Sequence, residues 1–323
     1  MDATLSRRAF LTGLAGGAVW FSMSAYGWAV AGQKKSAGIP IAMFHKVDDA
    51  PQYPEDISSN LLSDLFDYAW TQGFYPVNMS DILLGRVDQV VPKGLKPLGL
   101  TADDSHRSIF YNRAQVSDPD QRNERSFYEI LVESATRYGC DSRATFFVCE
   151  ESNNRYSGAK GYFGNTKALP EIVKKASATP GVEFAFHTRW HKSMAKMGYA
   201  ETIVVMRDQI DQLEALGVLD YFVRILAYPF GLRPKKSGIA ALKDLGFYGG
   251  VLALGGKGEA GEGPTPFCRY EGKLLGDPFL VPRANLGAKL YNNEIQLKPF
   301  NPLDDFDKDI GKRNDLYVSK GAL

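Results

Sequence analysis

Short runs of apolar residues alternate with amphipathic segments along most of the chain. The apolar runs are rich in branched and aromatic side chains, which is typical of buried strands. They cover residues 39–44, 74–77, 97–101, 144–149, 182–186, 221–227, 247–254 and 280–283. The amphipathic segments carry apolar residues three or four positions apart, so we expect helices over residues 59–70, 80–84, 127–138, 169–176, 199–216 and 237–245.

Several of these helices have recognisable capping residues at their ends. Ser58 or Ser59 precedes the first helix, and Ser80 is expected to begin the short second one. Gly139 and Gly217 follow the last periodic residue of two helices, where glycine readily adopts a left-handed conformation. We therefore expect local sequence to delimit each of these helices.

The order of strand, helix, strand and helix predicts an α/β fold with a parallel sheet, closed into a barrel. In such sheets ligands bind at the carboxyl ends of the strands. The polar residues that directly follow the predicted strands are therefore the first candidates for a functional site.

Two carboxylates, Asp103 and Asp104, follow the strand over residues 97–101. A buried carboxylate is costly unless a metal ion, a cation or a proton compensates it. Adjacent residues of a strand point to opposite faces, so a glycosidase-type pair flanking one bond is not the natural interpretation. A division of labour fits better, with one acid binding a metal and the other handling protons. A simple cap-and-turn pair is the structural alternative.

His187 and His191 form the second candidate, directly after the strand over residues 182–186. If a helix begins there, an i,i+4 pair in its first turn places both imidazoles on one side, as a divalent metal requires. Two histidines and one carboxylate form an open catalytic set for zinc. The alternative is a pair of exposed or capping histidines, since the 323 residues contain only four His.

The overall composition indicates an ordinary globular enzyme, with 44% hydrophobic and 23% charged residues. The formal net charge of +1 argues against recruitment of nucleic acid or of an anionic membrane. Cys140, Cys149 and Cys268 lack CxxC spacing, so neither a disulfide framework nor a thiolate zinc site is indicated.

The N-terminal residues are typical of an export signal. Arg7 and Arg8 precede Phe-Leu in a twin-arginine-type pattern, an apolar stretch of small residues covers 12–25, and Ala-Val-Ala ends at Ala31. We expect residues 1–31 to be a cleaved signal and the protein to be periplasmic or extracellular, with retention as a membrane anchor as the alternative. Residues 291–323 are charged and weakly periodic, which predicts a surface tail after a catalytic domain over 32–290.

Three segments resemble the motifs of the polysaccharide deacetylases, the NodB homology domains of carbohydrate esterase family 4. Residues 100–104, Leu-Thr-Ala-Asp-Asp, are similar to the first motif, Thr-Phe-Asp-Asp-Gly. Residues 187–191 resemble the His-Ser/Thr-x-x-His motif, and residues 227–231 resemble the Tyr-Pro-Tyr-Gly motif. Supporting matches are Phe-His-Lys-Val at 44–47, Ala-Thr-Phe-Phe at 144–147 and Pro282-Arg283.

This resemblance implies a distorted (β/α) barrel of about seven strands that hydrolyses N-acetyl groups of an amino-sugar polysaccharide or oligosaccharide. It implies one divalent metal ion, expected to be zinc, with Asp104, His187 and His191 as ligands. A metal-bound water would attack the acetamide, with Asp103 as general base and the backbone N–H of Phe230 facing the oxyanion. The implied partner is an N-acetylated glycan.

The sequence also departs from the family pattern. Ala102 replaces a Phe, and Ser105-His106 stands where the family has Gly followed by Pro or Tyr. His106 is either a surface loop residue or a contact of the site. The usual motif arginine is Ala227 here, so Arg224 or Arg283 is expected to orient Asp103 instead.

The late catalytic histidine of the family is also missing. His45 is most simply a strand-end structural residue, and no residue is assigned to protonate the leaving amine. Two alternative functions therefore stay open: an esterase or amidase acting on another acyl substrate, and a non-catalytic carbohydrate-binding relative.

Overall fold

The computed structural model describes residues 37–50, 56–110, 125–151, 161–253, 267–285, 290–291 and 294–295. It divides into two units, one over residues 38–288 and the other combining 1–37 with 289–323. The expected signal, residues 1–31, lies outside the described residues, as does most of the expected tail. In the second unit, β13 (Leu290–Tyr291) and β14 (Glu294–Ile295) form an antiparallel pair.

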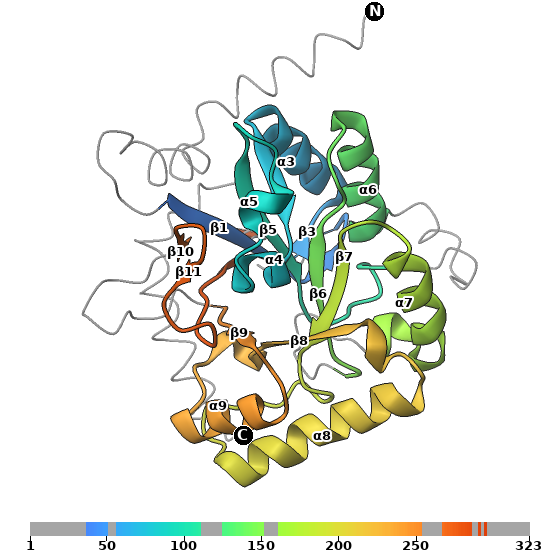
Figure 1. Ribbon diagram of the computed structural model, residues 1–323. Helices are drawn as coiled ribbons and strands as arrows, with labels where there is room; N and C mark the ends of the chain where they lie inside the picture. The colour runs from blue at the N-terminus through green and yellow to red at the C-terminus, as the bar shows by residue number, and fades with distance from the viewer. Residues whose placement is uncertain are drawn as a thin grey trace, which may run out of the picture. The chain divides into compact units, whose positions relative to one another are not determined.

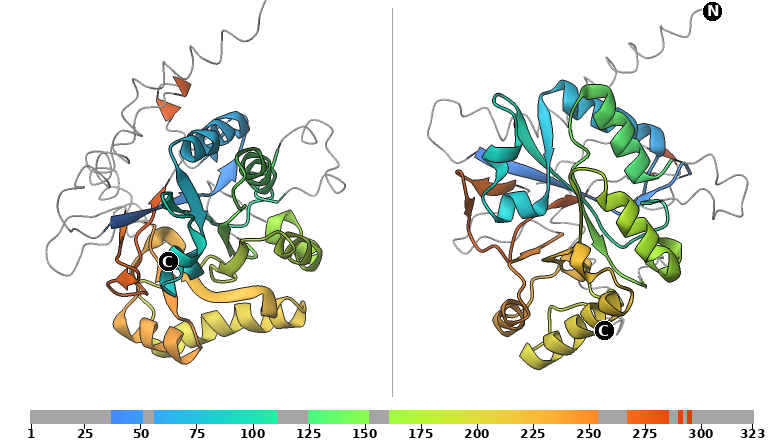
Figure 2. Two further views of the ribbon diagram at one scale, coloured as in Figure 1. Left: turned by 45° about the horizontal axis from the view of Figure 1, so that its top comes forward. Right: turned by 45° about the vertical axis from the view of Figure 1, so that its right-hand side comes forward.

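The larger unit is built on one curled sheet whose central strands are parallel (Figures 1 and 2). Its strands follow the order β11-β10-β1-β5-β6-β7-β8-β9, with β4 also paired to β5 and β12 to β1. They are β1 (Ala37–Phe44), β4 (Phe74–Val77), β5 (Lys96–Ala102), β6 (Ala144–Val148), β7 (Val182–Phe186), β8 (Phe222–Ala227), β9 (Gly249–Val251), β10 (Phe267–Tyr270), β11 (Leu274–Leu275) and β12 (Ala284–Asn285).

The chain around residues 281–285 connects the two sides of this sheet. Val281 forms a parallel bridge with Val251 of β9. Three residues later, Ala284 of β12 pairs with Ala42 of β1. This connection curls the sheet into a distorted (β/α) barrel, which confirms the predicted fold class. The sheet has ten strands rather than about seven, because short strands from the C-terminal part of the unit join it.

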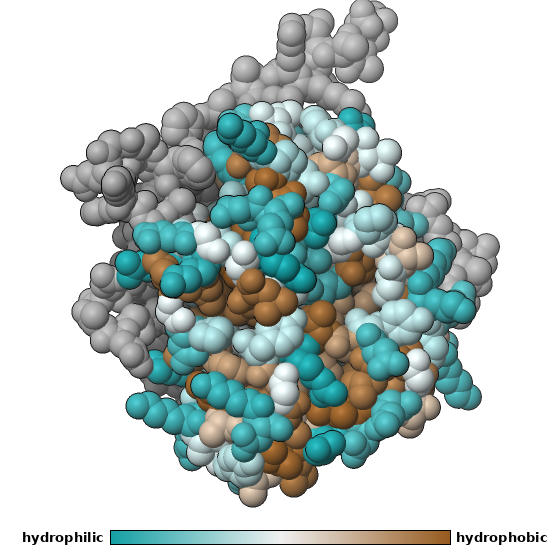
Figure 3. Space-filling model, in the orientation of Figure 1, coloured by the Kyte–Doolittle hydropathy of each residue, from teal (hydrophilic) through white to brown (hydrophobic). Residues whose placement is uncertain are grey.

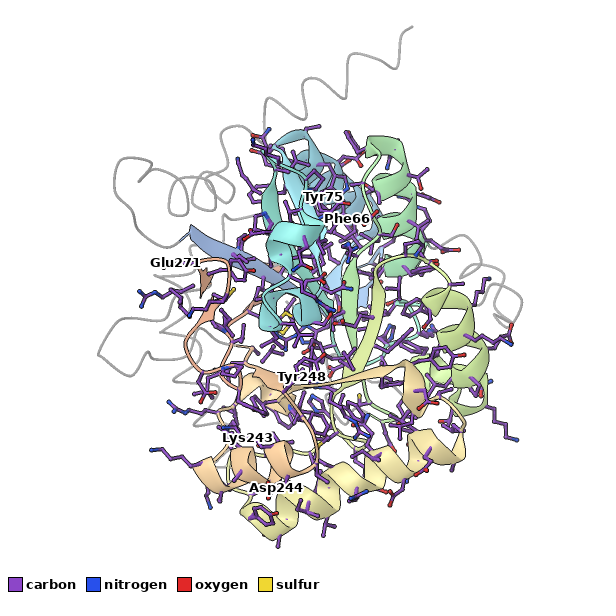
Figure 4. All side chains as sticks on the ribbon, viewed as in Figure 1. Phe66, Tyr75, Lys243, Asp244, Tyr248 and Glu271 are labelled. Carbon is purple, nitrogen blue, oxygen red and sulfur yellow. The ribbon has the colours of Figure 1, made fainter. Side chains whose placement is uncertain are left out.

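Helices surround the strands on the outside (Figure 1). They are α3 (Ser59–Thr71), α6 (Phe127–Tyr138), α7 (Leu169–Ser177), α8 (Tyr199–Ala215) and α9 (Lys236–Asp244). The limits of α6 are those predicted, because Ser126 and Glu129 form a capping box and Gly139 ends the helix with a φ of 68°. Ser58 caps α3 by accepting a hydrogen bond from the backbone N–H of Leu61. The hydroxyl of Tyr199 donates to Asp244 and joins α8 to α9, whose C-terminal residues Lys243 and Asp244 are labelled in Figure 4.

Two groups of apolar side chains hold the unit together. Between α3 and the sheet, Phe66 packs edge-on against Phe127 of α6 at a centroid distance of 5.6 Å (Figure 4). Inside the curled sheet, alternate residues of the strands meet the apolar face of α4 (Met79–Leu83), which contributes Met79 and Ile82. Burying each such side chain stabilises the fold by about 1.5–3 kcal/mol, so these contacts hold α4 in the interior of the curled sheet.

Several predicted boundaries were wrong, and most of them involve short elements. Asn78 rather than Ser80 precedes α4, and Asp81 completes its capping box. The strand expected over 247–254 is limited to β9, and the strand expected over 280–283 is a single bridge followed by β12. The short strands β10 and β11, the helix α5 (Val87–Val90) and the pair of β2 (Lys46–Val47) with β3 (Asp56–Ile57) were not predicted. Each of these elements is only two to four residues long, too short for a periodic pattern to reveal it.

The three cysteines are free thiols, of which Cys149 and Cys268 are buried and Cys140 is partly buried. Within the described residues, every helix is too short or too polar to span a bilayer. Hydrophilic and hydrophobic residues are interspersed on the face of the protein seen in Figure 3.

Candidate metal and catalytic site

The candidate residues converge because the strands that carry them are parallel. Asp103 and Asp104 follow β5, His187 follows β7, and Phe230 lies in the turn after β8. The carboxyl ends of these strands lie at the same edge of the sheet. Residues far apart in sequence are thereby brought to one place, as in other α/β barrels.

Asp104, His187 and His191 form a compact group of possible metal ligands. One carboxylate oxygen, Oδ1 of Asp104, lies 3.0 Å from Nε2 of His187 and 3.1 Å from Nε2 of His191. The ligand atoms of the three residues all lie within 4.8 Å of one another, and all three side chains are buried. Two imidazole nitrogens facing one carboxylate oxygen form a donor set that suits a divalent cation.

The orientation of His187 fits the same role. Its Nδ1 lies 2.8 Å from the carbonyl oxygen of Ala227, which can only accept, so Nδ1–H donates and Nε2 is the ring nitrogen that faces Asp104. A hydrogen bond from the second ring nitrogen is the usual way in which a protein fixes a metal-binding imidazole. His191 lacks such support, because its Nδ1 is buried without a partner.

The two histidines do not lie in the first turn of a helix, and that part of the prediction was wrong. Thr188 and His191 have φ values of 54° and 50°, in the left-handed region that interrupts a right-handed helix. The next helix, α8, begins only at Tyr199. A tight turn, in which the Thr188 hydroxyl accepts from the N–H of Lys192, brings the imidazoles together instead.

Asp103 is held by a different partner. Both of its carboxylate oxygens accept hydrogen bonds from Arg283, each at 2.7 Å. Arg283 is fully buried, lies 5.0 Å from the ring centroid of Phe147 and also donates to the hydroxyl of Thr101. Of the two expected arginines, Arg283 is therefore the one placed on Asp103, while Arg224 packs against the rings of Phe186 and Phe247.

The charges of the site maintain the ionised form of both carboxyl groups. Burial alone would raise the pKa of Asp103, but the positive charges of Arg283 and His187 outweigh it and lower that pKa. Burial of Asp104 is likewise outweighed by His191 and His187, and the pKa falls well below its usual value. For His187 the burial effect would lower the pKa, yet the hydrogen bond to Asp104 and both negative charges raise it.

The turn after these acids is strained and firmly anchored. Asp104 and Ser105 have φ values of 68° and 50°, where glycine would be the natural choice. The Ser105 hydroxyl accepts from the N–H of Cys149 at 2.9 Å, and its carbonyl accepts from the N–H of Phe163 at 3.0 Å. These bonds give a physical reason for Ser105 at a position where the related motif has Gly.

The two remaining histidines border the site. His45 follows β1, its positive charge contributes to lowering the pKa of Asp103, and its Nδ1 is buried without a partner. His106 is half-buried rather than a freely exposed loop residue. Its pKa is lowered to about 4 by burial and by the positive charges of Lys46 and Arg107, so the imidazole is neutral at pH 7.

Sequence reasoning missed the proximity of His45 to Asp103. One signal was available, since His45 continues the alternation of Ile39 and Ile41, which point into the interior of the curled sheet. That alternation predicts an imidazole at the mouth of the barrel.

The aromatic residues near the site differ in exposure. Phe230 has a φ of 62° and packs its ring 4.5 Å from that of His191. Trp190 is 40% exposed, with its indole N–H donating to Asp208. Tyr162 and Phe163 are buried.

Residues 96–250 match the family model described as Polysaccharide deacetylase. No curated protein matches the sequence. Among solved structures, the deacetylase PplD of Streptococcus pyogenes, in complex with acetate, is 17% identical with a TM-score of 0.51, covering 78% of this chain and 93% of that one. IcaB of Ammonifex degensii is 17% identical with a TM-score of 0.50, covering 79% of this chain and 93% of that one. At this identity the structural likeness shows the fold.

Proposed function

We propose, on the premise that this chain carries a polysaccharide deacetylase domain, that the protein removes N-acetyl groups from an amino-sugar polysaccharide or oligosaccharide. The protein is accordingly an enzyme of the hydrolase class. The observation that carries the proposal is the juxtaposition of the possible metal ligands Asp104, His187 and His191 with the ionised pair of Asp103 and Arg283.

The residues present fit a divalent metal ion, and we propose zinc. Nε2 of His187 and of His191 and one oxygen of Asp104 would hold it, and His187 is already oriented by the carbonyl of Ala227. When bound, such an ion supplies Lewis acidity, which acidifies a water ligand and polarises a carbonyl oxygen.

Asp103 is the general base in this proposal. Its bidentate contact with Arg283 fixes the carboxylate and maintains it in the ionised form, so it can accept a proton at neutral pH. Its Oδ2 lies 4.0 Å from Nε2 of His187, which places the base directly beside the ligand group.

The backbone N–H of Phe230 is the proposed donor to the oxyanion. The support is its position, because the Phe230 ring packs against the ligand His191 and its left-handed conformation follows directly after β8. A preorganised N–H aimed at a developing negative charge lowers the barrier of acyl transfer.

His45 is the proposed donor of the proton that the leaving amine needs. His187 and His191 are assigned to the metal, and the low pKa of His106, about 4, leaves it neutral at pH 7, whereas Nδ1 of His45 has no partner. The backbone N–H of Asp103 donates to the carbonyl oxygen of Phe44, so His45 follows directly after a residue bonded to Asp103. The alternative is that Asp103, once protonated, returns its own proton to the amine.

The experiment that tests this function measures acetate release by the zinc-loaded protein from N-acetylglucosamine oligomers and from acetylated xylan. Release from the oligomers alone supports the proposal. Release from xylan alone indicates an esterase, and oligomer binding without release indicates a non-catalytic relative. The variant His45→Ala is expected to retain zinc and to lose most of kcat, because the leaving amine then lacks its proton donor. If kcat of His45→Ala stays at the wild-type value, Asp103 performs both proton transfers.

Export by the twin-arginine route to the periplasm or the extracellular space is part of the same proposal, and Arg7 and Arg8 support it. The variant Arg7→Lys/Arg8→Lys is expected to accumulate inside the cell with residues 1–31 attached. Unchanged export and processing of this variant would contradict the proposed route.

A further inference from the structure

His106 is the histidine of the site to which the proposed reaction assigns no task. It lies two residues after Asp104, in the turn anchored through Ser105 to Cys149 and Phe163. The carbonyl of His106 also accepts from the N–H of Ile109 at 2.9 Å. The backbone that carries this imidazole is therefore fixed relative to the ligand group.

The neighbours of Nδ1 define the tautomer of His106. The backbone N–H of Ser108 lies 3.2 Å from Nδ1, and because an N–H can only donate, Nδ1 must accept. The Ser108 hydroxyl lies 2.8 Å from the same nitrogen and itself accepts from the N–H of Val47 at 2.9 Å, so its hydrogen is directed to Nδ1. In the resulting neutral ring the hydrogen is on Nε2.

This Nε2–H has no acceptor among the described residues. His106 is only half-buried. Nδ1 of His45 and Nδ1 of His191 are buried polar atoms without a partner, and Nε2 of His106 does not belong to this group. An oriented donor on a fixed backbone, without an acceptor among the described residues, is suited to bind an oxygen of a ligand.

We propose that Nε2–H of His106 donates a hydrogen bond to a hydroxyl or ring oxygen of the amino sugar whose acetamide lies at the ligand group. The inference rests on the proposed function and deepens it, because it names a residue that selects sugar amides over simple amides. His106 lies two residues after the proposed ligand Asp104, and the turn between them is held by the hydrogen bond of Ser105 with Cys149. The sugar oxygens nearest to an acetamide are then the acceptors within its reach.

The test compares the zinc-loaded wild type with His106→Ala and His106→Gln on an N-acetylglucosamine oligomer and on an aryl acetamide that lacks a sugar. Loss of one hydrogen bond of about 1.4 kcal/mol predicts a tenfold lower kcat/KM of His106→Ala on the oligomer, mainly through KM. The aryl acetamide should be cleaved at the wild-type rate. His106→Gln should recover most of the loss, because its amide nitrogen can occupy the place of Nε2. Arg107→Ala, at the exposed neighbouring residue, is the matched control, and its kcat/KM should equal that of the wild type on both substrates.

Two results would overturn the inference. One is an unchanged kcat/KM of His106→Ala on the oligomer. The other is an equal loss on both substrates without recovery in His106→Gln, which indicates a structural role. If the wild type cleaves no acetamide, the proposed function fails, and the inference is then tested by titrating the oligomer into the zinc-loaded protein. A tenfold weaker Kd for His106→Ala supports it, whereas an equal Kd, or no binding by the wild type, contradicts it.

Discussion

Two buried carboxyl groups lie near opposite ends of the same curled sheet, and their surroundings differ. Asp103 follows the carboxyl end of β5 and accepts two hydrogen bonds from the guanidinium of Arg283. Glu183 lies near the beginning of β7, where its partners are the neutral hydroxyl of Thr145 and the backbone N–H of Ser80. Both side chains are almost completely buried.

The pKa values of the two groups shift in opposite directions. Burial raises the pKa of Glu183, and its two neutral donors reduce that rise without reversing it, while the nearby charge of Asp81 adds to it. Arg143 and Arg86, two cations of that region, are both paired with Asp81. Burial of Asp103 is outweighed by Arg283. The comparison shows that neutral hydrogen-bond donors leave the pKa of a buried carboxyl group raised in this fold, whereas a buried guanidinium lowers it.

Asp103→Asn is expected to have the largest effect on activity. The amide keeps the shape of the side chain but cannot accept a proton, so kcat should fall by about 10²–10⁴-fold, the usual contribution of a general base. The measurement is acetate release from N-acetylglucosamine oligomers, with zinc content determined in parallel. Glu183→Gln is the matched control, since it makes the same change at the other buried carboxyl group and should leave kcat unchanged. A kcat of Asp103→Asn close to that of the wild type would remove Asp103 from the mechanism.

Arg283→Met is expected to cost the most stability. It leaves the buried carboxylate of Asp103 without a cation, which lowers the free energy of unfolding by about 3–5 kcal/mol. The pKa of Asp103 should rise, and the acid limb of kcat/KM should move to higher pH. Urea unfolding and a pH profile measure the two effects.

The double variant Asp103→Asn/Arg283→Met provides the control for this change. Removing both charges should destabilise the protein less than the sum of the single changes, because neither charge is then left buried alone. Strictly additive losses would show that the two side chains are not energetically coupled.

Much of the fold can be predicted from local sequence. The strands β4 and β7 and the helix α6 have the predicted limits, because each is defined by its own periodicity and flanking residues. A barrel was predicted, but the pairs that close it were not, because Val281 and Ala284 pair with Val251 and Ala42, and no local pattern encodes such distant partners.

The residues of the site could be named from the sequence, but its geometry could not. His187 and His191 were expected on a helix, and they converge through a left-handed turn instead. The choice between Arg224 and Arg283 as the partner of Asp103 depended on the same unpredicted pairing of residues 281–285. Sequence spacing therefore identifies chemical groups, and distances depend on turns and long-range pairing.

Zinc affinity should decrease as the pH falls. This decrease should begin at a higher pH than it would if the ligands were isolated histidines. Burial opposes protonation of His187, but Asp104 and Asp103 raise its pKa, and a metal must displace that proton. The proton therefore competes more strongly as pH falls through the raised pKa. Competition of zinc with a chelator at a series of pH values measures this.

Asp103→Asn again serves as the control for this measurement. Removing one negative charge near His187 should lower its pKa and move the loss of zinc affinity to lower pH. An unchanged pH dependence would mean that Asp103 does not act on the ligand group.

Glu183→Gln is expected to have the smallest effect, and one that depends on pH. The raised pKa means that folded Glu183 binds a proton more readily than unfolded Glu183, so its ionisation costs stability as pH rises from about 4.5 through the folded pKa. Below that window the carboxyl group is protonated in both states and the cost is absent. The amide that replaces this carboxyl group cannot ionise, so the stability of the variant relative to the wild type should increase from pH 4 to pH 8. Urea unfolding at both values measures the difference, with Glu214→Gln as an exposed control that should show no such trend. If the stability of Glu183→Gln relative to the wild type falls with pH, Glu183 is more readily ionised in the folded protein than in the unfolded chain, as Asp103 is. The contrast between the two carboxyl groups would then not hold.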